Sequence, residues 1–296
     1  MKSSSRIQTN SLRAWILAAR PQTLTSAAVP VMTGTAAAWT DGSLLFVPAV
    51  LCFIFAFLMQ IDANFINDYY DFRNGLDNKD RLGPKRACAE GWITLPAMRK
   101  GIACTSVLSC LTGLPLVIYG GWNMVIIGAC CVAFCFLYTT CMARMGLGDL
   151  LVLVFFGIVP VCTTYYLQTG TLTPKIWILS LACGLGTDCL LVVNNYRDRE
   201  NDKTGGKITL VVKIGEKAAE NLYLWLGFAA VGLCQAMWHF GQPAAALLPI
   251  CYLGLHLTTW KHLTSIRRGK ALNHTLGETA RNILVFGMLL TIGLII

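Results

Sequence analysis

Charged residues are scarce in this sequence. Asp, Glu, Lys and Arg make up only 13% of the 296 residues, whereas soluble globular domains carry about 25%. Hydrophobic residues account for 55%, and the mean hydropathy is +0.58. So few charges do not suffice to cover a water-facing surface, and the composition therefore predicts an integral membrane protein.

Cysteine pairs with metal-binding spacing are also missing. The chain has 13 cysteines, but no two of them form a CxxC pair, and most lie inside apolar segments. A free cysteine behaves as a small hydrophobic residue, so we expect these side chains to serve packing. The first 20 residues are polar and basic and lack the apolar core of a cleavable signal peptide.

Long apolar segments are what the chain has in abundance. A helix needs about 20 apolar residues to cross a bilayer, and about nine segments approach that length. We therefore predict an all-α, multi-pass transmembrane bundle around a central cavity, with residues 1–296 forming one membrane-embedded domain. The segments lie at about 22–39, 44–67, 97–119, 122–140, 150–168, 175–196, 219–238, 243–260 and 281–296.

The basic residues predict the orientation of this bundle. If the segments alternate across the membrane, every Lys and Arg except Lys175 falls on one side. Cytoplasmic loops carry this bias, so we place the N-terminal segment 1–21 and the large loops in the cytoplasm of a cell (inner) membrane. The net charge of +9 follows from this topology and from attraction to anionic lipid. No nucleic-acid partner is expected.

Two acidic motifs stand at the cytoplasmic ends of predicted spans. They are NFINDYYDFRNGLD at 64–77 and NNYRDREND at 194–202. Each has an Asn four residues before an Asp, and each follows the second span of a set of four. The chain is therefore interpreted as two related four-helix halves facing each other across the cavity, with a ninth helix added.

Each motif forms a polar stripe if its helix continues through it. Asn64, Asp68 and Asp71 fall within an arc of about 60°, and the second motif's acids within about 80°. Carboxylates are disfavoured at a helix C-terminus and costly near a membrane, which favours a functional role over a solvated helix end. Oxygen ligands of this kind suit Mg²⁺ bound to substrate phosphates. The second stripe contains Asn194, Asp198 and Asp202.

Basic residues beside the motifs are candidates for gripping a diphosphate. Arg81 and Arg86 follow the first motif, and Lys207 follows the second in the glycine-containing stretch TGGKITL. Arginine offers a forked donor to phosphate oxygens, and flexible glycines allow backbone N–H groups to approach an anion. Each of these residues also has a simpler interpretation as a positive-inside signal.

At these residues the sequence resembles the UbiA superfamily of intramembrane prenyltransferases, and more closely its 1,4-dihydroxy-2-naphthoate polyprenyltransferases of menaquinone biosynthesis. The paired Asp motifs are the general signature. The segments RLGPKRA (81–87) and GLGDLLVLVFFGIVPVCTTYYLQTG (146–170) indicate the naphthoate group. The resemblance extends from ARPQTLTSAAVPVMTGTAAAW (19–39) to the LN…TARNILVFGMLLTIGLII pattern at the C-terminus.

The resemblance implies transfer of a polyprenyl group from an allylic polyprenyl diphosphate to 1,4-dihydroxy-2-naphthoate, with loss of CO2. It implies two Mg²⁺ ions held by both motifs, with the lipid bilayer receiving the isoprenoid tail. The residues that match the family's catalytic and metal-binding acids are Asp68, Asp71, Asp198 and Asp202. Those that match supporting positions are Asn64, Asn67, Asn194 and Asn195, the third acid Asp77, and Tyr138 near the first isoprene unit.

Several alternatives stay open at the level of sequence. Some relatives carry a lysine shortly after the tyrosine. This chain has Met142 at that position, so the role of that lysine cannot be assigned to a residue here. Asp62 and Asp188 match no family carboxylate; they are interpreted as a pair, as protonated acids, or as part of the acceptor pocket. One alternative is a prenyltransferase of the same superfamily that uses a different acceptor. Another, in a different functional class, is a divalent-cation transporter, because intramembrane acids also build ion pathways.

Overall fold

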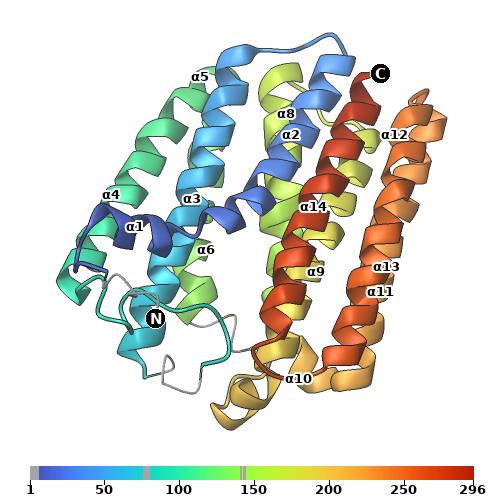
Figure 1. Cartoon of the computed structure of the whole chain (residues 1–296). Coiled ribbons are helices and arrows are strands. Elements are labelled where there is room, and N and C mark those ends of the chain that lie inside the picture. The colour runs from blue at the N-terminus through green and yellow to red at the C-terminus, as the bar shows by residue number, and fades with distance from the viewer. Residues whose placement is uncertain (1–6, 76–80, 141, 143–144) are drawn as a thin grey trace.

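The described part of the chain is entirely helical. The computed structural model describes residues 7–75, 81–140, 142 and 145–296, and within these ranges helices are the only regular secondary structure (Figure 1). The all-α prediction is thereby confirmed.

Each predicted apolar segment coincides with a helix or with a row of consecutive helices. The first half contains α2 (Leu24–Thr40), α3 (Phe46–Arg73), α4 (Leu95–Gly113) continued by η2 (Leu114–Leu116) and α5 (Val117–Gly120), and α6 (Asn123–Thr140). The second half contains the row α7 (Gly148–Leu153), η4 (Val154–Ile158) and α8 (Val159–Thr169), then α9 (Pro174–Thr204). It continues with α11 (Glu216–Cys234) and η5 (Gln235–Phe240), and with the row α12 (Pro243–Leu247), η6 (Leu248–Cys251) and α13 (Tyr252–Ile266). The remaining elements are α14 (Leu272–Ile295), α1 (Leu12–Ala19), η1 (Pro21–Thr23) and α10 (Leu210–Ile214).

Five helices or helix rows are long and apolar enough to cross a membrane. The structure supports these five by length and composition, while the number of crossings stays a prediction. They are Phe46–Arg73, Leu95–Gly120, Gly148–Thr169, Pro174–Thr204 and Leu272–Ile295.

The two motif helices continue beyond the apolar segments from which they were predicted. The prediction ended these segments at residues 67 and 196, but α3 continues to Arg73 and α9 to Thr204. At 1.5 Å per residue their 28 and 31 residues span about 42 and 46 Å, against a hydrocarbon core of about 30 Å. The acids Asp68, Asp71, Asp198 and Asp202 therefore lie toward the ends of helices that are longer than the core is thick.

The helices pack so that α3 and α9 face a common end of the bundle. α3 packs against α4 and α6, α9 packs against α11, η4 and α14, and α2 lies between α8 and α14. Figure 1 shows α2 and α14 side by side and the loops after α3, α9 and α13 together at the lower end. The two motifs, far apart in the sequence, are thus brought to one end of the molecule.

Much of the outer surface is apolar, as a membrane-embedded bundle requires. Ile118 is 83% exposed and Phe46 76%, so large hydrophobic side chains point away from the protein interior. Tryptophans are common where a membrane meets water. At the end of the bundle opposite the motifs the exposed tryptophans are Trp39, Trp122, Trp177 and Trp238.

Gly157 lies where the backbone of the row α7–η4–α8 comes close to the backbone of α9. A Cβ atom on Gly157 would lie 2.5 Å from the carbonyl oxygen of Ser180 and 2.8 Å from Cα of Gly184. Small residues let membrane helices approach at backbone distance. The π-helical turn η4 surrounds this glycine, and such turns accommodate local irregularities within α-helices.

Gly157→Ala is expected to lower stability by about 1–3 kcal/mol, because the new methyl group meets backbone atoms that have no rotamer with which to avoid it. The matched control is Gly128→Ala on α6, where a Cβ would meet nothing within 4 Å. That substitution should be neutral or stabilising by up to about 1 kcal/mol. Thermal unfolding of both variants in detergent tests the contact; equal melting temperatures would contradict it.

Candidate active site

The first acid of motif one is buried and holds the segment that follows α3. Asp68 is 0% exposed. Its Oδ2 accepts a hydrogen bond from the backbone N–H of Ala87 (2.9 Å), and its Oδ1 accepts one from Cys88 (3.0 Å). The Arg20 guanidinium lies 3.9 Å from Oδ2. Asp68 therefore folds the RLGPKRA segment back over the end of its own helix.

Asp71, one turn further along α3, faces the predicted basic residues. Its Oδ2 accepts a hydrogen bond from Arg86 Nη2 at 3.2 Å, and Arg86 is 8% exposed. Arg81 and Lys207 also lie close enough to interact electrostatically with this carboxylate. The structure thus brings together Arg81, Arg86 and Lys207, although Lys207 belongs to the other half of the chain.

A buried arginine organises the second motif. The Arg197 guanidinium, with a side chain only 1% exposed, forks onto Asp198 with Nε–Oδ1 and Nη2–Oδ2 distances of 2.8 and 2.5 Å. It also donates to the Asn194 side chain at 2.9 Å and to Asn273 at 3.0 Å. Asp198 is therefore held as one member of a hydrogen-bonded network that includes α14.

Asp202 lies one turn beyond Asp198 and pairs with Lys207. The Lys207 Nζ is 3.5 Å from Asp202 Oδ2, at the outer limit of a hydrogen bond. The Lys207 backbone N–H donates to the Asp202 carbonyl at 2.8 Å, so the turn after α9 folds back onto the motif. Within the described ranges, Asp202 Oδ2 is buried without a well-formed hydrogen bond.

The RLGPKRA segment connects the two motifs directly. Besides its contacts with Asp68 and Asp71, its Leu82 carbonyl accepts a hydrogen bond from Asn273 Nδ2 at 2.8 Å. Gly83 packs on the second motif, since a Cβ there would lie 2.7 Å from Arg197 Nη2. One short segment therefore contacts acids or their partners on α3, α9 and α14.

Tyr138, at the end of α6, lies beside both motifs. It interacts electrostatically with Asp71 of the first motif and Asp202 of the second, as well as with Asp149 and Asp188. Together with Asn195, Lys207 and Asp149 it lines a small pocket between α6, α7 and α9. The position of Tyr138 near the first isoprene unit stays a prediction.

The motif asparagines have different surroundings. Asn64 is 4% exposed and donates to the Ala19 carbonyl and the Thr23 hydroxyl, both at 2.9 Å. It therefore ties α3 to the turn that carries Arg20. Asn194 is held by Arg197, Asn195 lines the pocket, and Asn67 is half-buried at the end of α3.

Other predicted residues lie elsewhere or outside the described ranges. Asp77 lies outside the described residues. Asp62, on the opposite face of α3, accepts hydrogen bonds from Thr105 and, at 2.7 Å, from Ser106 of α4. The interpretation of Asp62 and Asp188 as a mutual pair is therefore wrong, because Asp188 instead neighbours Asp149 and Tyr138.

Four residues of the site were not assigned a role from the sequence. Arg20 was counted with the basic residues that predict the orientation, and Arg197 was not among the three basic residues chosen to bind the diphosphate. Asn273 and Asp149 belong to segments that carry the family resemblance, LN at 272–273 and GLGD at 146–149. For Asn273 and Asp149, the signal in the sequence was a polar residue within a segment that carries the family resemblance.

The donor set suits a hard divalent cation. Within the described ranges, both carboxylate oxygens of Asp149 and one each of Asp188 and Asp202 are buried without a hydrogen-bond donor. Buried carboxylates without a counter-charge are costly. Oxygen ligands with neighbouring phosphate-type basic residues fit Mg²⁺ better than Zn²⁺, which favours nitrogen and sulfur.

Comparison with known proteins agrees with this geometry. The profile of the UbiA prenyltransferase family matches residues 27–276. The chain belongs to the UbiA prenyltransferase family. The expected enzyme class, a membrane prenyltransferase, is thereby confirmed, and with it the expectation of an integral membrane protein.

Relatives within the UbiA family carry a more specific name. The 1,4-dihydroxy-2-naphthoate octaprenyltransferase of Escherichia coli (strain K12) is 37% identical over 241 residues, which cover 78% of each chain. The protein of the same name from Bacillus subtilis (strain 168) is 27% identical over 293 residues, covering 94% of this chain and 90% of the relative.

Solved structures of UbiA homologues share the fold. The apo structure of a homologue from Aeropyrum pernix K1 has a TM-score of 0.71 at 16% identity, over 90% of this chain and 97% of that one. A homologue from Archaeoglobus fulgidus bound to DMAPP and Mg²⁺ has a TM-score of 0.60 at 16% identity, over 94% and 99% of the two chains.

Asn273→Ala is expected to lower turnover about tenfold, since it removes one hydrogen bond to the RLGPKRA segment and one to Arg197, worth about 1–3 kcal/mol together. Asn282→Ala is the matched control. Asn282 lies on the same helix but donates to Leu255 and Thr259 of α13. Both variants should lose similar stability, and only Asn273→Ala should lose activity. Equal activities would show that Asn273 has a purely structural role.

Proposed function

We propose that this chain transfers a polyprenyl group from an allylic polyprenyl diphosphate to 1,4-dihydroxy-2-naphthoate in menaquinone biosynthesis. The allylic C–O bond breaks, a C–C bond forms to the naphthoate ring, and diphosphate and the carboxylate, as CO2, leave, which produces demethylmenaquinol. The observation that carries the proposal is the RLGPKRA segment. It joins the two acidic motifs, and it is the segment by which the sequence resembles the naphthoate group.

The proposed metal site uses the acids of both motifs. Asp68, Asp71, Asp198 and Asp202 would hold two Mg²⁺ ions, with Asn64, Asn67, Asn194 and Asn195 supporting them and Asp77 contributing a third acid. Asp68 and Asp198 already have donors on their oxygens, so each would use its remaining lone pairs. Bound Mg²⁺ supplies charge neutralisation for the departing diphosphate.

The chain's own residues would bind and orient the diphosphate. Arg81, Arg86 and Lys207 surround Asp71 and offer forked or point-charge contacts to phosphate oxygens. Their positive charges favour the diphosphate as its negative charge grows during bond cleavage. The ring face of Tyr138 would stabilise positive charge developing on the allylic carbon. Apolar surroundings would keep water from that carbon.

The proposed setting is the cytoplasmic face of the cell membrane, with residues 1–296 acting as one membrane-embedded unit. The basic loops that surround the motifs all lie at the motif end of the bundle (Figure 1). This concentration of basic loops supports an arrangement in which segment 1–21 and the site loops face the cytoplasm.

The alternatives receive less support. A divalent-cation transporter would place acids through the depth of the membrane. Here the motif acids gather at one end. The two other acids that would favour transport are Asp62 and Asp188. Asp62 is hydrogen-bonded to two hydroxyl groups of α4, and Asp188 neighbours Asp149 and Tyr138. A UbiA-type enzyme with a different acceptor is the second candidate, because the acceptor rests on the resemblance of the RLGPKRA segment and on the names of relatives.

The test is an assay of the purified full-length protein in detergent with 1,4-dihydroxy-2-naphthoate, a polyprenyl diphosphate and Mg²⁺, with an EDTA control. Metal-dependent formation of the decarboxylated prenyl-naphthoquinol, followed by mass spectrometry, is the expected result. Cleavage of diphosphate with the naphthoate left intact would overturn the acceptor assignment. Mg²⁺ flux in sealed vesicles without prenyl transfer would overturn the enzyme assignment.

A further inference from the structure

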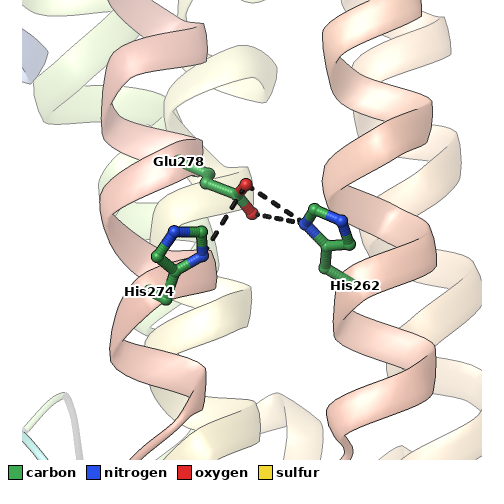
Figure 2. A group of neighbouring side chains, drawn as sticks. All are labelled: His262, His274 and Glu278. Atoms are coloured by element: carbon green, nitrogen blue, oxygen red, sulfur yellow. Dashed lines mark hydrogen bonds and ion pairs between the residues drawn. The ribbon is translucent and has the colours of Figure 1, made fainter.

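A second group of potential metal ligands lies outside the acidic motifs. His262 near the end of α13 faces His274 and Glu278 on the first turns of α14 (Figure 2). The Nδ1 atom of His262 lies 2.9 and 3.1 Å from the two Glu278 oxygens, and Nδ1 of His274 lies 3.7 Å from Oε1. All three ligand atoms are within 4.8 Å of one another.

The burial of these side chains indicates a site with an open side. The Glu278 side chain is only 12% exposed, whereas those of His262 and His274 are 43% and 72% exposed. In the described part of the chain, the partners of the Glu278 carboxylate are these two imidazoles, and no Lys or Arg pairs with it. A largely buried carboxylate needs a positive partner, which a cation bound between the imidazoles and Glu278 would supply.

The ligand chemistry matches a transition metal rather than Mg²⁺. Two imidazole nitrogens and one carboxylate oxygen are a known catalytic zinc ligand set, with a fourth position left to solvent. Zinc–ligand bonds of about 2.0–2.2 Å in a tetrahedral arrangement place the ligand atoms about 3.4 Å from one another. This value lies within the range of distances between the histidine nitrogens and the Glu278 oxygens. Imidazole suits Zn²⁺, Cu²⁺ and Ni²⁺, whereas Mg²⁺ prefers hard oxygen donors.

We propose that His262, His274 and Glu278 form a Zn²⁺-type site that joins α13 to α14. Nδ1 of each imidazole would bind the ion while Nε2 keeps its proton. The site is separate from the acidic motifs but adjacent to them, because Asn273, the residue before His274, contacts both Arg197 and the RLGPKRA segment. Zn²⁺ binding here does not depend on the proposed prenyl transfer.

The experiment is a calorimetric titration of Zn²⁺ into the full-length protein in detergent, after removal of bound metal. Thiols are first alkylated with N-ethylmaleimide, and excess Mg²⁺ is present to occupy the acidic motifs. The variants are His262→Ala, His274→Ala and their combination. The matched control is His239→Ala, because His239 is exposed in η5 at the other end of the bundle.

The expected result is one Zn²⁺ per chain in the unmodified sequence and in His239→Ala. Each His variant at the site should weaken binding more than tenfold, that is by more than about 1.4 kcal/mol. Zn²⁺ should also raise the melting temperature of the unmodified protein by mass action and leave that of the double variant unchanged.

Equal Zn²⁺ affinity in the double variant and the unmodified protein would overturn the proposal, as would failure to bind Zn²⁺. Mg²⁺-dependent prenyl transfer by the double variant would show that these outcomes are independent of the proposed function.

Discussion

Asp202→Asn is expected to lower prenyl transfer by about a thousandfold, the cost of losing a preorganised charge at a reacting centre, while the melting temperature stays the same or rises. The Asp202 carboxylate is 12% exposed, has Lys207 at 3.5 Å, and lies within electrostatic reach of Asp198. An amide of the same shape removes the cost of burying this charge, which outweighs the attraction of Lys207, so stability does not fall. It also removes a ligand charge, so more Mg²⁺ should be needed for half-maximal activity.

A matched control for Asp202→Asn is available at the opposite end of the bundle. Asp41 accepts hydrogen bonds from Lys175 (2.7 Å) and the Tyr165 hydroxyl (2.6 Å). Asp41→Asn should lower stability and leave turnover and Mg²⁺ dependence unchanged. Turnover and Mg²⁺ titrations on both variants separate the two roles. Activity of Asp202→Asn within tenfold of the unmodified protein would remove Asp202 from the proposed metal site.

Arg197→Met is expected to cost about 3 kcal/mol or more of stability, because it leaves a largely buried carboxylate without its partner. The apparent melting temperature should fall by about 10 °C, and activity should fall as well, since Asp198, Asn194 and Asn273 all lose a donor. Thermal unfolding in detergent and the prenyl-transfer assay measure the two effects.

The companion variant Arg197→Lys separates charge from geometry. Lysine retains the positive charge but cannot form the fork that holds both oxygens of Asp198. We expect it to recover much of the stability lost in Arg197→Met while activity stays low. Full recovery of activity by lysine would mean that the orientation of Asp198 matters less than the neutralisation of its charge.

The helical architecture was predictable because a membrane restricts the choice of structure. A buried backbone in lipid must satisfy its own hydrogen bonds within helices, so apolar segments of sufficient length translate directly into helices such as α3 and α9. Their polar faces followed from the helical repeat alone. The positions of the helix ends were not predictable in the same way, because polar residues such as Asp68 and Asp71 end an apolar segment without ending the helix.

The connections between the motifs were beyond sequence patterns. The distance from Gly83 to Arg197 depends on how the two halves pack, which no local periodicity describes. Proximity in sequence is a poor guide for the basic residues, since Arg199 stands beside Asp198 yet donates to Glu216 at 2.8 Å and to the Tyr196 carbonyl at 2.6 Å. The basic residues that surround Asp71 come instead from both halves of the chain.

The overhang of α3 and α9 has a consequence for the route of a substrate. Because the acids stand on the ends of helices longer than the hydrocarbon core is thick, we expect their depth to match that of phospholipid phosphates. A polyprenyl diphosphate resting in the bilayer would meet them by lateral diffusion in the plane of the membrane. Its tail would never enter water, a transfer that costs about 0.8 kcal/mol for each CH2 group. The quinol product would likewise remain dissolved in the membrane from which its precursor came.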